Sequence, residues 1–95
     1  MNTVIEYTTK ETAKLIKQEL NGSYSHIKFS VTVAPKRSML SGNKIEIRFT
    51  ATEKEIKEIE KLVEKYRHNQ IVDELEIKYN VNYLFVWAFT AKVGA

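Results

Sequence analysis

The final strand-like segment of this chain constrains the fold most, because apolar side chains occupy both of its faces. Residues 83–90 read Tyr-Leu-Phe-Val-Trp-Ala-Phe-Thr, a composition typical of a β-strand. Alternation sends Tyr83, Phe85, Trp87 and Phe89 to one side, and Leu84, Val86 and Ala88 to the other. A strand with two apolar faces needs cover on both. We therefore expect part of the second face to be buried by self-association, by a partner, or by residues 71–82.

Two capping boxes predict two helices. A Thr-x-x-Glu pattern at residues 8–11 opens a helix to about Asn21, and Gly22 is placed to end it. The same pattern at residues 52–55 opens a second helix to about Arg67. Both helices carry an apolar stripe and are expected to lie against a sheet.

Two alternating segments predict a β-hairpin. Apolar and polar side chains alternate strictly over residues 27–33 and again over residues 44–49, and a turn-rich loop at residues 35–43 joins them. A further short strand is expected over residues 4–7. Residues 71–79 fit both a strand and a helix, and we expect a short irregular or helical connection there.

These elements predict a single α+β domain over residues 1–95. We expect a small, mainly antiparallel sheet of three or four strands with two helices on one face, in the order (β)αββαβ. If the N-terminal strand is real, the order becomes the split βαβ pattern of ferredoxin-like domains.

The composition disfavours several kinds of chemistry. The chain has no cysteine, only two histidines and one aspartate, so we expect no disulfide, metal site or cofactor. Ser23, Ser25 and His26 cluster in sequence, but this proximity alone does not predict a catalytic triad. We expect a protein that is not an enzyme. Because no secretory signal or membrane-length apolar run is present, we expect a cytoplasmic location.

Short motifs in a fixed order carry a resemblance to a known family. They are Thr12-Ala13-Lys14, then Lys28-Phe29-Ser30-Val31, then Ser41-Gly42, and finally the alternating run from Ile45 to Phe49. In residues 10–60 the chain resembles the large polyvalent-protein-associated domain of phages and conjugative elements. The resemblance implies an accessory protein of a phage, plasmid or conjugative transposon, and it supplies no catalytic residues.

Two binding hypotheses follow. In the first, a protein partner or a second copy of the chain covers an interface of Phe85, Trp87 and Phe89, because exposed apolar patches mark interfaces. This hypothesis includes a counter-defence protein that blocks a host complex, and a homodimer. In the alternative, the module binds RNA or single-stranded nucleic acid through bases stacked on these aromatic residues.

The alternative needs cations beside the aromatic side chains, which requires the final strand to join the hairpin sheet with its aromatic residues on the hairpin's polar face. Residues 1–50 carry eight Lys or Arg against four Glu, a mildly basic balance. Five of these cations lie on the polar face or in the loop of the predicted hairpin: Lys28, Lys36, Arg37, Lys44 and Arg48. The competing interpretation is that the aromatic side chains form the core. The signatures of KH and RNP recognition are absent.

Overall fold

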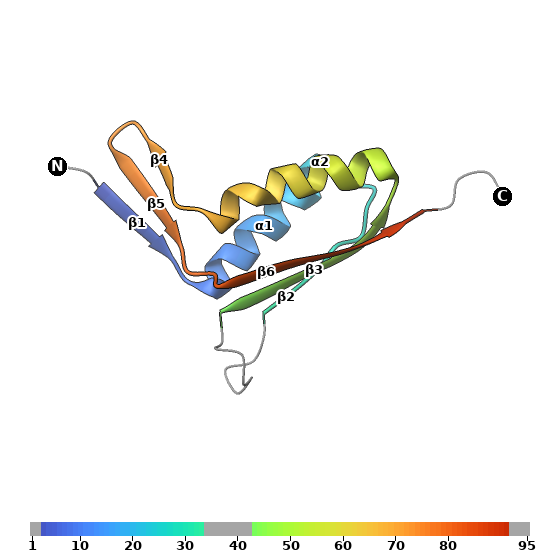
Figure 1. Cartoon of the computed structure of the whole chain (residues 1–95), viewed down its shortest axis with the longest axis horizontal. Coiled ribbons are helices and arrows are strands. Elements are labelled where there is room, and N and C mark those ends of the chain that lie inside the picture. The colour runs from blue at the N-terminus through green and yellow to red at the C-terminus, as the bar shows by residue number, and fades with distance from the viewer. Residues whose placement is uncertain (1–2, 34–42, 92–95) are drawn as a thin grey trace.

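The computed structural model describes residues 3–33 and 43–91, which form two helices and two three-stranded sheets (Figure 1). In chain order the elements are β1 (Thr3–Tyr7), α1 (Thr9–Ser23), β2 (Ser30–Val33), β3 (Lys44–Ala51), α2 (Glu53–Val63), the short 3-10 helix η1 (Glu64–Arg67), β4 (Gln70–Val72), β5 (Leu75–Tyr79) and β6 (Tyr83–Thr90). Sheet A has the order β1-β5-β4, and sheet B has the order β2-β3-β6. The α+β class is confirmed.

Sheet B contains the predicted hairpin, with β2 antiparallel to β3. The final strand, β6, joins the other side of β3, but it runs parallel to β3 from the Lys44–Tyr83 pair to the Ala51–Thr90 pair. The prediction of a mainly antiparallel sheet is therefore wrong for this pair. Its physical reason is the long crossover through α2 and the β4–β5 hairpin, which brings the chain back to the end of the sheet where β3 began.

Sheet A corrects two further expectations. Residues 70–79 form the β4–β5 hairpin, not an irregular or helical connection. Asp73 adopts φ 56° at the turn, a left-handed conformation that Asp tolerates and that allows the tight reversal. The N-terminal strand β1 is present, but it pairs in parallel with β5 and not with sheet B. The arrangement is therefore not ferredoxin-like.

Both predicted capping boxes are present, at Thr8 with Glu11 and at Thr52 with Glu55. The first helix continues through Gly22 to Ser23 instead of ending before the glycine, because Gly22 does not adopt the left-handed conformation that would end the helix there. Tyr24 is the C-cap, and its backbone N–H donates to Leu20 O at 2.8 Å. The second helix ends at Val63, and η1 continues it to Arg67. Within the described ranges, neither helix combines the length and apolar content needed to cross a bilayer.

Both helices lie on the same side of sheet B, and the core fills the space between them (Figure 1). The fully buried side chains of this core include Ile16 and Leu20 of α1, Ile45 and Ile47 of β3, and Ile59 of α2. Each comes from the apolar stripe or alternating face that the sequence shows. Among residues 3–33 and 43–91, no helix or strand covers the opposite side of sheet B.

Asn80 fixes sheet A to the start of α1. Its backbone N–H and its Nδ2 both donate to the carbonyl oxygen of Tyr7, at 3.0 and 2.8 Å. Its own carbonyl accepts a hydrogen bond from Thr9 Oγ1 at 2.6 Å. The link between β5 and β6 is thereby tied to the point where β1 ends.

A tyrosine cluster packs beside this junction. The Tyr66 hydroxyl donates to Glu19 Oε1 of α1 at 2.6 Å, and its ring meets Tyr79 edge-on with 4.9 Å between centroids. Tyr79 in turn stacks on Tyr7 of β1 at 5.8 Å. Burial, followed by the hydrogen bond to Glu19, raises the pKa of the Tyr66 phenol well above its ordinary value. The cluster joins α1, η1 and both strands of the parallel pair in sheet A.

This cluster predicts an alkaline dependence of stability. Because the folded-state pKa of Tyr66 lies above its ordinary value of 10.0, its contribution to folding is complete below about pH 10 and declines as the pH rises further. Tyr66→Phe should cost about 1–3 kcal/mol at neutral pH, through loss of the bond to Glu19. The difference between wild type and Tyr66→Phe, measured by urea unfolding, should shrink above about pH 10. A difference that stays constant with pH would contradict this assignment.

Candidate binding surface on sheet B

The side of sheet B that faces away from the helices presents three rows of side chains, and we call it the open face. The β2 row is Ser30 and Thr32, preceded by Lys28; the β3 row is Lys44, Glu46, Arg48 and Thr50; the β6 row is Tyr83, Phe85, Trp87 and Phe89. Alternation along each strand sends these residues to one side because their neighbours are buried against the helices.

The β6 row is exposed along its whole length. Tyr83, Phe85, Trp87 and Phe89 retain 41%, 40%, 50% and 60% of their accessible surface. Tyr83 and Phe85 stack at 6.1 Å between ring centroids. The interpretation of these aromatic residues as core is therefore wrong, because the smaller side chains of β6 take the core side. Residues 71–82 do not cover the row either, since most of them form sheet A.

The β3 row carries two cations and one carboxylate, a formal net charge of +1, and both cations contact that carboxylate. Glu46 lies between them, with Lys44 Nζ at 2.9 Å and Arg48 Nη2 at 3.2 Å. The hydrogen bond from Lys44, together with the charges of both cations, holds the pKa of the Glu46 carboxyl below its ordinary value. Lys44 Nζ also lies 5.6 Å from the centroid of the Phe85 ring, within reach of a cation–π contact.

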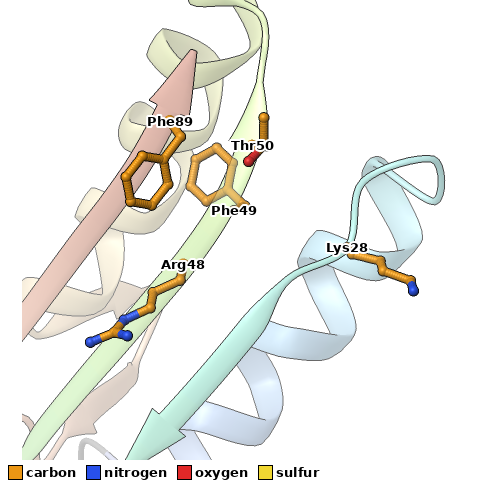
Figure 2. A pocket seen from close by; sticks show the side chains of 5 residues that line it. All are labelled: Lys28, Arg48, Phe49, Thr50 and Phe89. Carbon is orange, nitrogen blue, oxygen red and sulfur yellow. The ribbon is translucent and has the colours of Figure 1, made fainter. Parts of the chain in front are cut away.

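A shallow hollow of about 300 Å³ lies at the end of the open face where β3 and β6 finish. Its lining consists of Lys28, Arg48, Phe49, Thr50 and Phe89 (Figure 2). The charged ends of Arg48 and Lys28 point away from one another in Figure 2, so the two cations do not converge on one point. The hollow can receive a planar or apolar group against Phe89 with polar groups at its rim.

The outer edge of β6 is a second feature of this surface. Tyr83 N–H donates to Asn43 O at 3.1 Å, and Ala91 N–H donates to Ala51 O at 2.8 Å. Because the two strands are parallel and in register, the N–H and C=O groups of the odd-numbered β6 residues bond to β3. The N–H and C=O groups of the even-numbered β6 residues point to the outer edge. Arg67 Nη2 donates to the outward carbonyl of Leu84 at 2.9 Å.

The structure brings Lys44 and Arg48 to the same face as Phe85, Trp87 and Phe89, which is the condition that the nucleic-acid hypothesis sets. Lys28 precedes β2 and lines a hollow together with Arg48 and Phe89. Lys36 and Arg37 lie outside the described residues. The assignment of these eight residues to binding stays a prediction.

Sequence reasoning missed Glu46, Thr50 and Arg67. Glu46 could have been found, because it alternates with Lys44 and Arg48 and so shares their face. The contact of Arg67 with β6 has no such signal, since it depends on how η1 is placed.

The polar side chains away from the open face were compared with the requirements of a catalytic triad and of a metal site. His26 Nε2 lies 2.5 Å from Glu55 Oε2, and this bond, ahead of those from Thr52, lowers the pKa of the Glu55 carboxyl. His26 is exposed and has no hydrogen bond to a serine hydroxyl among the residues described. Over residues 3–33 and 43–91, no three His, Cys, Asp or Glu side chains gather in a metal-binding geometry.

Exposure of the β6 row can be measured with the single tryptophan of the chain. Trp87 is half exposed, so the folded protein should emit at long wavelength and iodide should quench it nearly as well as it quenches the urea-unfolded chain. Iodide is an anion that cannot enter an apolar core. Blue-shifted emission that iodide leaves unquenched would place Trp87 in a buried environment and contradict the open face.

Searches of curated proteins and of solved structures find no match to this chain. A family model does match: that of large polyvalent protein associated domain 29, over residues 7–92. The match includes both helices, all of sheet B, and the β4–β5 hairpin, so it extends well beyond the residues 10–60 that carry the sequence resemblance. The chain therefore belongs to the family of large polyvalent protein associated domain 29.

Proposed function

We propose that this chain is a non-catalytic accessory module of a phage, plasmid or conjugative element, and that its open face binds a protein partner. Membership in a family named for association with large polyvalent proteins supports the genomic setting. Obstruction of a host defence complex is one form that such binding takes.

The observation that carries the proposal is the exposed β6 row. Four aromatic side chains stand next to one another on one strand, each at least 40% exposed. Monomeric proteins keep contiguous apolar patches small, and a larger patch with a polar rim marks an interaction site. Phenylalanine, tyrosine and tryptophan are enriched in protein interfaces, and tryptophan and tyrosine are among the residues that carry most of the binding energy. The polar β3 row supplies the rim on one side of the patch.

The electrostatics of the β3 row favour a protein over a nucleic acid. Lys44 and Arg48 share the single carboxylate of Glu46, so neither cation of the row is without an anionic partner, and the row keeps a formal charge of only +1. A phosphate backbone would have to compete with that carboxylate for both cations, whereas affinity for nucleic acid depends on cations available to replace counterions. An apolar protein surface can pack on the β6 row without disturbing these ion pairs.

The proposal predicts capture of a protein that depends on the β6 row. Tagged wild-type chain should retain a host protein from a nuclease-treated lysate, and Trp87→Ala or Phe85→Ala should reduce its recovery at least about tenfold, as loss of an interface hot spot does. Thermal unfolding of each variant checks that the fold is intact.

The matched control is Ile71→Ala. Ile71 is 75% exposed and lies in β4 of sheet A. Its substitution by alanine therefore removes exposed apolar surface without changing the open face. Recovery should be unchanged in this variant and after charge reversal at Lys36 and Arg37. Equal recovery by wild type and Trp87→Ala, or equal loss in Ile71→Ala, would overturn the assignment of the docking surface.

A second candidate function is binding of single-stranded nucleic acid, which one specific observation favours: the hollow combines Lys28, Arg48 and an exposed aromatic ring, Phe89. This reading predicts quenching of Trp87 fluorescence by a single-stranded oligonucleotide, with an affinity that falls steeply as salt is raised. Charge reversal at Lys28 and Arg48, or at Lys36 and Arg37, should then weaken binding. Absence of quenching at low salt would exclude this candidate.

A further inference from the structure

We propose that the outer edge of β6 pairs antiparallel with β6 of a second copy across a twofold axis at Ala88. The two sheets B then join into one sheet with the order β2-β3-β6-β6-β3-β2. This inference concerns the edge of β6, so it stands apart from the proposed function, which concerns the open face.

The edge of β6 lacks the protection that proteins normally give to edge strands. Natural edges are shortened, charged, interrupted by proline or covered, because a free edge is a template for another strand. The strand β6 has eight residues and contains no charged residue, proline or glycine. The opposite edge of sheet B is β2, with only four residues, and β4 at one edge of sheet A has three.

The backbone N–H and C=O groups that are free at this edge lie mainly in the second half of β6. Even-numbered residues of β6 direct their N–H and C=O outward, and in the described part of the chain no strand pairs with them. Arg67 already occupies the carbonyl of Leu84. Among the described residues, Val86, Ala88 and Thr90 therefore present both a free N–H and a free C=O at this edge, whereas Leu84 presents only its N–H.

The placement of these groups favours a second copy as the occupant. In a twofold interface the same patch faces itself, so its free groups must be symmetric about one residue. Val86 and Thr90 lie two residues either side of Ala88, which satisfies this condition. Ala88 then pairs with Ala88 of the partner subunit, and Val86 pairs with Thr90 of the partner subunit, with Leu84 left to Arg67.

The same register brings aromatic side chains together on the open face. Trp87 lies directly opposite Phe89 of the partner subunit, in the non-hydrogen-bonded position where cross-strand side chains are closest. The pairing also closes the assembly, since only the two short β2 edges remain at the ends of sheet B. A dimer is thereby reached without further growth along sheet B.

The test begins with sedimentation velocity of the wild-type chain over a concentration series. The result expected is a reversible monomer–dimer equilibrium. Ala88→Pro removes the outward N–H while sparing the bonds to β3, and proline is tolerated at such edge positions. It should raise the dimer dissociation constant by at least about tenfold, because two symmetry-related hydrogen bonds are lost.

The matched control is Val31→Pro, on the opposite edge of sheet B. Odd-numbered residues of β3 bond to β6, so its even-numbered residues bond to Ser30 and Thr32, and the N–H of Val31 points outward. This variant should dimerise as wild type does. Far-UV circular dichroism reports whether each proline variant is folded.

Cross-linking keeps the test decisive if a proline variant fails to fold. The chain has no native cysteine, so Trp87→Cys and Phe89→Cys each introduce a single thiol. Directly opposite residues suit a disulfide, whereas the diagonal separation of about 7–8 Å between like positions does not. A mixture of the two variants should therefore form the mixed disulfide in preference to either self-disulfide. A wild-type chain that stays monomeric throughout, a dimer unaffected by Ala88→Pro, or no preference for the mixed disulfide would overturn the proposal.

Discussion

The structure depends on how one strand divides its side chains between core and surface. The small residues of β6, Leu84, Val86 and Ala88, pack with the apolar side of β3 against the two helices. Its aromatic residues, which carry more apolar surface, are left outside. The division follows from space, because α1 and α2 already fill the helix side of sheet B, while the other side has no covering layer in the described residues.

The second sheet holds this arrangement in place. The crossover between β3 and β6 includes the β4–β5 hairpin, and β5 is anchored by its parallel pairing with β1. Asn80 then binds the end of β1, and the start of β6 follows within three residues. Arg67 contacts the first part of the outer edge of β6. Sheet A therefore acts as a support that sets where β6 begins and how it lies beside β3.

Local patterns predicted the helix starts and the two faces of each strand well. The capping boxes located both helix starts, and alternation separated Lys44 and Arg48 from the buried side of β3 and the aromatic residues of β6 from its smaller ones, because each signal depends only on neighbouring residues. Which face of β6 lies on the helices was not predicted, because it depends on how β6 joins β3. Strand direction and partner choice failed for the opposite reason. Two features depend on backbone contacts between distant segments: the pairing of β1 with β5 and the parallel direction of β6. The pattern of residues 71–79 fits both a strand and a helix, and pairing with β1 is what makes residues 75–79 a strand. Backbone contacts of this kind do not produce a periodic pattern of side chains in the sequence.

The central claim is that β6 is bonded on one edge and available on the other. Amide hydrogen exchange followed residue by residue, at a dilution where the chain is monomeric, tests it directly. The account predicts a period of two along β6: slow exchange at Phe85, Trp87 and Phe89, whose N–H groups face β3, and fast exchange at Val86, Ala88 and Thr90. Uniform protection along the strand, or the reverse alternation, would contradict the account.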